Sequence, residues 1–214
     1  MENIIQRVRQ SLSESVDEKT LATGQRFFKE KIKLYGVKTT VVHSIAKKYF
    51  EDIKHEPKQT IFGLCEELWK SGITEETYIA CDWSYRINKR YESDDLETFE
   101  HWVDRYVNNW ASCDSLCNHS VGDFLMMYPQ YIDRMKFWAV SENRWMRRAA
   151  AVSLIIPARK GMFLDEIFDI ADILLHDTDD LVQKGYGWML KAASQAHLHE
   201  VFEYVVSKKA VMPR

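Results

Sequence analysis

Glycine and proline, the residues that most often mark turns, are scarce in this sequence. The chain has 8 glycines and 4 prolines among 214 residues, whereas a protein of many short strands needs turn signals at intervals of roughly 8–12 residues. No stretch of alternating polar and apolar residues is long enough to predict a strand. The chain is therefore predicted to be all-α.

Two segments near the C-terminus show the helical period most clearly. Apolar residues three or four positions apart share one side of a helix, so each segment is predicted to be an amphipathic helix with one buried side. Capping signals agree, with Thr74-Glu75-Glu76 expected to open one helix and Asp177-Thr178-Asp179 another. The two stripes consist of Leu164, Ile167, Phe168, Ala171, Leu174 and Leu175, and of Val182, Tyr186, Met189, Leu190 and Ala193.

Short helices on short loops recur along the chain without a glycine-rich linker. This organisation predicts a single domain over residues 1–214, built from HEAT-like repeats of antiparallel helix pairs that form a curved α-solenoid with a concave face. Breaks between helices are expected at Tyr35-Gly36, Lys70-Ser71-Gly72 and Ile156-Pro157, among others. The repeats do not align to a consensus, so a compact helical bundle is the alternative architecture.

The charge is distributed unevenly. The formal net charge is -3, which argues against a protein that coats nucleic acid through bulk charge. Residues 1–60 nevertheless hold 12 Lys and Arg against 8 Asp and Glu, whereas residues 61–140 hold 7 against 14. A local basic surface is compatible with this pattern, and a global one is not.

Nothing in the sequence predicts export or membrane insertion. Met1-Glu2-Asn3 is not followed by the basic and apolar regions of a signal peptide. No apolar run approaches the roughly 20 residues of a membrane helix. The four cysteines show no pairing pattern, which is typical of a reducing compartment. We expect a cytoplasmic protein, of the bacterial cytosol or associated with the nucleoid.

A tryptophan lies four residues before an aspartate in the middle of the chain. If a helix runs through both, Trp110 and Asp114 share one face. If instead Ser112 is the N-cap, Asp114 lies in the first turn, where the helix dipole favours its ionised form. Both alternatives place an anion beside an indole ring, and this combination suits a substrate that carries or develops positive charge.

Trp188 is predicted to lie away from the core of its helix. The helical projection groups it with Lys184 and Lys191, opposite the apolar stripe. A tryptophan there meets either a neighbouring helix or a ligand, and the two alternatives have about equal weight. Gly185 and Gly187 each cost about 1 kcal/mol of helix stability relative to alanine. Their presence suggests the close approach of another helix or of a phosphate backbone.

Three arginines occur together on another predicted helix. Arg144 and Arg148, four positions apart on the flank of the apolar stripe, can face one phosphate-bearing groove, and Arg147 lies further round. The alternative is an ion pair with the acidic middle segment. Trp145 projects onto the core side and is predicted to be structural.

A metal site at Cys113, Cys117 and His119 is not predicted. The Cys-x3-Cys spacing with one histidine supplies at most three soft ligands, and no second Cys/His pair follows. Cys117 shares a stripe with apolar residues, so a buried free thiol is expected.

With these residues in hand, the chain resembles the DNA alkylation repair family, the AlkD-like DNA glycosylases built from HEAT-like repeats. The resemblance covers nearly the whole chain, and the last two of the segments that carry it are specific in combination. The segments are Leu34-Tyr35-Gly36-Val37-Lys38-Thr39, Trp110-Ala111-Ser112-Cys113-Asp114, Asn143-Arg144-Trp145-Met146-Arg147-Arg148-Ala149-Ala150, and Val182-Gln183-Lys184-Gly185-Tyr186-Gly187-Trp188-Met189-Leu190.

The resemblance implies an enzyme that excises cationic N3- and N7-alkylated purines from duplex DNA held on the concave face. Asp114 would be the catalytic carboxylate, with Trp110 and Trp188 beside it. The implied DNA-binding residues are Arg148, Arg144, Arg147, Lys184, Lys191, Lys38 and Thr39. We expect a monomer that needs no cofactor or metal, and a monofunctional reaction, because no lysine is placed as a Schiff-base nucleophile.

Two other functions are compatible with the sequence. A non-catalytic HEAT-like module that binds damaged or branched DNA would keep the groove without the chemistry. The pair Trp110 and Asp114 speaks against it, because a pure phosphate binder gains nothing from an anion in its groove. A protein-interaction solenoid is the third hypothesis, modestly favoured by the net acidity.

Overall fold

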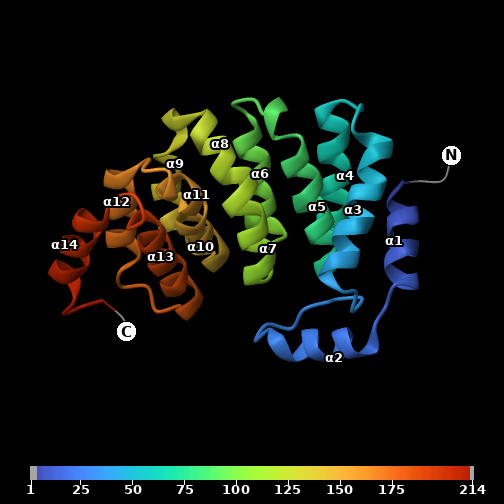
Figure 1. Cartoon of the computed structure of the whole chain (residues 1–214), viewed down its shortest axis with the longest axis horizontal. Helices are drawn as coiled ribbons and strands as arrows, with labels where there is room; N and C mark the ends of the chain where they lie inside the picture. Colours follow the sequence, from blue (N-terminus) through green and yellow to red (C-terminus); the bar gives the residue numbers. More distant parts are fainter. Residues whose placement is uncertain (1–3, 213–214) are drawn as a thin grey trace. The chain divides into compact units, whose positions relative to one another are not determined.

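The computed structural model describes residues 4–212, and every element of regular secondary structure in that range is a helix (Figure 1). Outside the helices, these residues contain one isolated bridge, between Lys33 and Ile73. The all-α prediction is therefore confirmed. The contacts divide the chain into two compact units, where the sequence predicted one domain. The single domain, the curvature and the concave face stay predictions.

The first unit comprises Met1–Glu92 and Arg105–Ser112. Within it α5 packs against α3 and α4, and α1 packs against the same two helices. Trp69 and Trp83 are among its fully buried side chains. The helices are α1 (Ile4–Glu14), α2 (Glu18–Phe27), α3 (Thr39–Ile53), α4 (Lys58–Ser71), α5 (Thr74–Arg86) and the 3-10 helix Asn88–Arg90.

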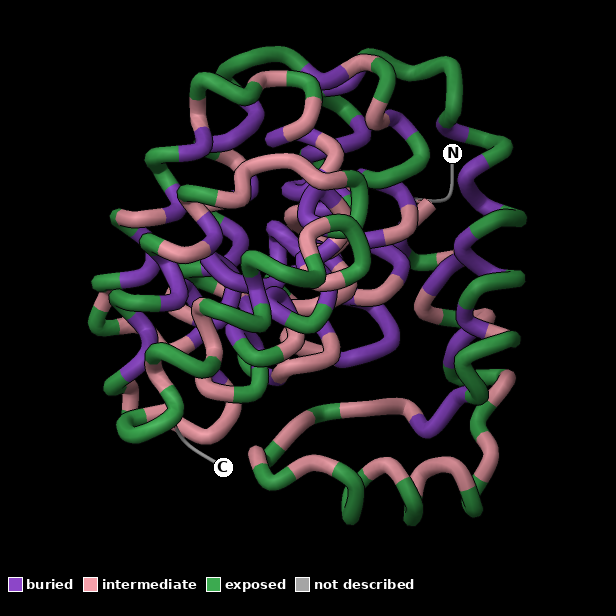
Figure 2. Tube along the Cα trace, turned by 60° about the vertical axis from the view of Figure 1, so that its left-hand side comes forward, coloured by how far each residue is buried: buried purple, intermediate pink, exposed green. Residues whose placement is uncertain are grey.

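Helix α2 differs from the other helices of this unit. It runs crosswise to α1, α3, α4 and α5 (Figure 1), and none of its own residues is buried (Figure 2). Asp17 caps its start by accepting the backbone N–H of Thr20 at 2.8 Å. Without a buried face, α2 depends on contacts at its ends and along one edge to stay in place.

The second unit comprises Ser93–Asp104 and Cys113–Arg214. Here α10 packs against α9 and α13, and α13 also packs against α11, α12 and α14. Two helices, α6 (Asp95–Arg105) and α7 (Trp110–Ser115), continue from one unit into the other. The remaining elements are the π-helix Leu116–Val121, α8 (Gly122–Met127), the 3-10 helix Pro129–Tyr131, α9 (Arg134–Ala139), α10 (Arg144–Val152), α11 (Ile155–Arg159), α12 (Leu164–Leu174), α13 (Asp180–Ala193) and α14 (Leu198–Lys208).

The sequence predicted most of these elements, with two local errors. Ile156-Pro157 is not a break but lies inside α11, because a proline in the first turn of a helix loses no intrahelical hydrogen bond. Thr74 begins α5 as expected, but its side chain donates to the carbonyl oxygen of Lys33 at 3.0 Å and does not cap the helix. Asp179 caps α13 as predicted.

Within residues 4–212, none of the helices combines the length and the apolar character needed to span a bilayer.

Candidate active site

Asp114 lies one residue before the end of α7. The helix is continuous from Trp110 to Ser115, and the side-chain oxygen of Asn109 accepts the backbone N–H of Ser112 at 2.9 Å. That bond is the one an N-cap residue makes. The helix therefore runs through both Trp110 and Asp114, and the alternative of an N-cap at Ser112 is wrong.

A π-helix, which has a wider turn than an α-helix, directly follows α7. Leu116–Val121 is π-helical, a conformation that is rare and frequently occurs at functional sites. A Cβ atom on Gly122, which follows it, would lie 3.0 Å from the carbonyl oxygen of Ser153, so glycine permits this close approach to the end of α10. Cys117 lies in the wide turn as a buried free thiol, as predicted.

Asp114 is held by Arg148 from α10. Arg148 Nε donates to one carboxylate oxygen of Asp114 at 2.8 Å, and Nη2 donates to the other at 2.7 Å. The third donor, Nη1, is bonded to the carbonyl oxygen of Leu181 at the start of α13. The side chains are 6% and 14% exposed for Arg148 and Asp114, respectively. This two-pronged pair fixes the orientation of the carboxylate.

Burial and the ion pair have opposite effects on the pKa values of Asp114 and Arg148. Burial raises the pKa of Asp114 above its ordinary value, and the hydrogen bonds and charge of Arg148 pull that pKa down without fully cancelling the rise. Burial lowers the pKa of Arg148, but Asp114 more than offsets this and the net change is upward. Because the arginine is always charged near neutral pH, we take Asp114 to be ionised there.

The predicted close approach at Gly185 is made by α10. A Cβ atom on Gly185 would lie 3.5 Å from Arg148 Cγ and 3.6 Å from Val152 Cγ1. Of the two alternatives given by the sequence, another helix is therefore the neighbour at this glycine. The position of a Cβ on Gly187 has no atom within 4 Å. A phosphate backbone at Gly187 stays a prediction.

The other two arginines of α10 are tied to the segment that precedes α13. Arg144 Nη2 donates to Asp179 at 2.9 Å, and Arg147 Nε donates to Asp177 at 2.5 Å. Arg147 also donates to the carbonyl oxygen of Ser141 at 2.9 Å. Ion pairs, the second alternative given by the sequence, therefore engage all three arginines, but only Arg148 pairs with the acidic middle segment. Their contact with DNA stays a prediction.

The residues around Trp188 lie where the helical projection placed them. Trp188 is half-buried, and Lys184 and Lys191 are exposed. Lys184 Nζ forms an ion pair with Asp180 at 3.1 Å, one turn earlier. Trp145 is buried, as expected for a structural residue.

Trp110 belongs to an aromatic cluster in the first unit that the sequence did not predict. The rings of Phe27 and Phe28, at the end of α2, each lie 5.6 Å from the Trp110 ring, measured between centroids. Phe27 is 64% exposed. A cavity of about 200 Å³ borders these three rings, and Thr39 and Glu75 also line it. The one signal in the sequence was two adjacent phenylalanines in a charged segment.

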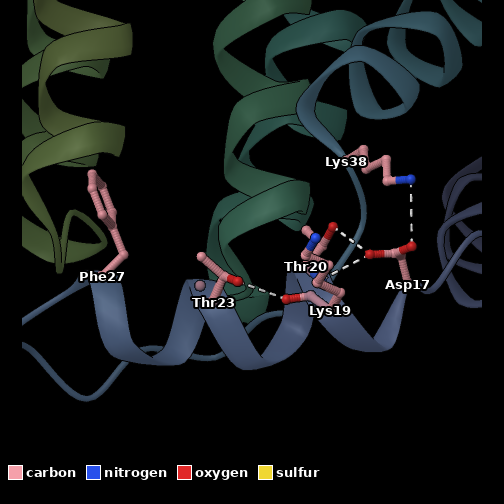
Figure 3. Close-up of a pocket in the computed structure, with 7 residues that line it drawn as sticks. Asp17, Lys19, Thr20, Thr23, Phe27 and Lys38 are labelled. Carbon is pink, nitrogen blue, oxygen red and sulfur yellow. Dashed lines mark hydrogen bonds and ion pairs between the residues drawn. The ribbon is translucent and has the colours of Figure 1, made fainter.

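Lys38 lies near the N-terminal end of α2. Its Nζ forms an ion pair with Asp17 at 3.4 Å, and both residues border a second cavity of about 470 Å³ together with Phe27 (Figure 3). Hydrogen bonds from Thr20 and the charge of Lys38 lower the pKa of Asp17. Lys38 and Thr39 are both exposed.

In residues 4–212 no three His, Cys, Asp or Glu side chains are grouped as metal ligands would be.

Fold and site define an all-α protein with a largely buried, arginine-oriented carboxylate, Asp114, just before a π-helical turn. The chain belongs to the DNA alkylation repair enzyme family, whose model matches residues 8–214. Its fold is similar to that of a protein described as a predicted DNA alkylation repair enzyme from Enterococcus faecalis. The two share 18% identity over 90% of each chain, with a TM-score of 0.81. Comparison with curated protein sequences gave no match. The family resemblance predicted from the sequence is confirmed.

Proposed function

We propose that the protein is a monofunctional DNA glycosylase that removes cationic N3- and N7-alkylated purines from duplex DNA and leaves an abasic site. The observation that carries this proposal is the Asp114–Arg148 pair. It presents an ionised, oriented carboxylate that retains 14% exposure of its side chain. Membership of a family of DNA alkylation repair enzymes supplies the substrate class.

The chemistry follows from charge. An N3- or N7-alkylpurine is already cationic, so the base leaves as a neutral molecule and needs no general acid. The difficult species is the sugar, which becomes oxocarbenium-like as the glycosidic bond lengthens. An anion at Asp114 stabilises that cation and orients the attacking water, whose oxygen bonds to the anomeric carbon while its proton is lost to solvent.

Arg148 serves this chemistry by positioning Asp114. Each carboxylate oxygen accepts one N–H from Arg148 and keeps a lone pair for the sugar or for water. Three of its five N–H groups already donate within the protein, which leaves one N–H on Nη1 and one on Nη2 for a phosphate. We therefore assign it to orienting the carboxylate first and to DNA contact second.

Trp110 and Trp188 are assigned to cation–π attraction, worth ~1–2 kcal/mol each when desolvated. Trp110 precedes Asp114 by four residues in α7, and Trp188 is half-buried on α13. The exposed side chains of Lys184, Lys191, Lys38 and Thr39 are assigned to the DNA backbone, with Arg144 and Arg147. The proposal includes a monomeric, cytoplasmic enzyme without a cofactor.

Base release from methylated duplex DNA tests the proposal. The purified protein is expected to liberate 7-methylguanine or 3-methyladenine, and to leave alkali-labile abasic sites in equal number. Borohydride is expected to trap no covalent DNA complex. A protein that binds the duplex but releases no base would contradict the glycosylase assignment.

A non-catalytic DNA-binding module is the second candidate, and one observation favours it. The negative charge of Asp114 is balanced by Arg148 in a largely buried ion pair, as in a purely structural salt bridge. Titration of duplex DNA at two salt concentrations, run beside the base-release assay, separates the candidates. Both DNA-binding functions predict an affinity that falls steeply with salt, and a protein-interaction module predicts no such binding.

A further inference from the structure

Glu75, in the first turn of α5, is a charged residue that is buried in the first unit. It is 4% exposed, and its partners in the described chain are three successive backbone N–H groups. Those of Gly36 and Val37 donate to Oε1 at 2.8 and 3.0 Å, and that of Tyr35 donates to Oε2 at 3.0 Å. Successive N–H groups in a turn form an anion-binding concavity, and here the anion is supplied by the chain itself.

The turn held by Glu75 is the junction between α2 and α3. Its glycine has a φ of +87°, and a Cβ atom there would lie 2.5 Å from Leu21 Cβ in α2. The carbonyl oxygen of Gly36 accepts the backbone N–H of Asp17 at 2.9 Å. The junction leads directly to Lys38 and to Thr39, the first residue of α3. Since α2 buries none of its residues, this turn is a main attachment of α2 to the unit.

We propose that Glu75 is a positioning residue for DNA binding, acting through the Gly36–Thr39 segment that it holds. The inference rests on the proposed function, which assigns Lys38 and Thr39 to the DNA backbone. A carboxylate suits the task because it accepts on both oxygens, and the dipole of α5 stabilises an anion in its first turn. An amide has one accepting oxygen, so glutamine could keep the bonds from Gly36 and Val37 only by turning its NH2 group towards the N–H of Tyr35.

The experiment compares Glu75→Gln with two other variants. Lys38→Ala removes the proposed phosphate contact itself. Glu97→Gln makes the same chemical change in the first turn of α6, where the side chain is exposed, and controls for loss of a charge at a helix start. Hydrogen exchange of the amides of residues 35–37 reports the turn, and a duplex DNA titration at several salt concentrations reports binding.

Glu75→Gln is expected to speed exchange at residues 35–37 by about tenfold or more, since bonds to a charged acceptor are lost. It should also weaken DNA binding by roughly threefold to tenfold, whereas Glu97→Gln changes neither. Lys38→Ala should lower the salt slope by about 1. In the double variant, Glu75→Gln should add little to the effect of Lys38→Ala, because both act on one contact.

Two results overturn the inference and are distinguishable. Faster exchange in Glu75→Gln with unchanged DNA affinity would show that the turn is structural only. A wild-type protein that binds no DNA would remove the proposed function itself, before any variant is compared. Should Glu75→Gln not fold, Glu75→Asp, which keeps the anion but shortens its reach, is expected to weaken binding in the same direction, and unchanged affinity there would be equally decisive.

Discussion

Replacing Arg148 by methionine tests the energetic role of the arginine–carboxylate pair. Methionine keeps much of the apolar stem but removes both donors to Asp114 and the donor to Leu181. Breaking a buried ion pair from one side typically costs about 3–5 kcal/mol, because the remaining charge is left unpaired. Asp114 retains 14% exposure of its side chain, so some water reaches it, and we expect about 3 kcal/mol.

A matched control lies on the surface of the same unit. Arg134 binds Glu100 with the same two-pronged geometry, Nε and Nη2 each at 2.9 Å, but the side chains are 49% and 27% exposed. Arg134→Met is expected to cost less than about 1 kcal/mol.

Urea unfolding of both variants measures the difference as a shift in midpoint at constant slope. Replacing Asp114 with leucine in the Arg148→Met background should recover part of the loss, since an apolar pair avoids the stranded charge. Equal costs for Arg148→Met and Arg134→Met would refute the reasoning.

Two further predictions concern the site. Base release should fall as the pH drops through the pKa of Asp114, and because burial raises that pKa the fall should be centred above the ordinary value of 3.8; a single-turnover pH profile with full activity at pH 4 would contradict either the raised pKa or the requirement for an ionised Asp114. Gly187→Ala should stabilise the protein by about 1 kcal/mol in thermal or urea unfolding, because a helix-interior glycine is replaced where a Cβ meets no atom within 4 Å. If a phosphate backbone needs the space at Gly187, the same variant should bind DNA more weakly, and unchanged affinity would remove that alternative.

The periodic parts of the fold could be predicted from the sequence because their pattern is local. The stripe that includes Val182 and Met189 gave the buried face of α13, and the phase of Trp145 gave its burial. The exposed Lys184 and Lys191 followed from the same projection. Such predictions need only the helical repeat.

The contacts that build the site are non-local, and the sequence did not contain them in readable form. Arg148 projected onto a flank, but its partner Asp114 lies 34 residues earlier. Glu75 looked like a capping residue, yet it reaches a turn about 40 residues before it. The ring of Phe28, which directly follows α2, packs against the ring of Trp110, although α2 itself has no buried face. In each case the side chain could reach several partners, and the tertiary packing determines which of them it contacts.

The most direct measurement of the central claim is single-turnover release of 7-methylguanine by the wild-type protein and by Asp114→Asn, with DNA affinity measured in parallel. Asparagine preserves the size of the side chain and removes the negative charge. The account predicts nearly unchanged DNA binding and a rate lower by roughly 10²–10³-fold, the cost of removing one pre-oriented electrostatic group. Release by Asp114→Asn at the wild-type rate would contradict it.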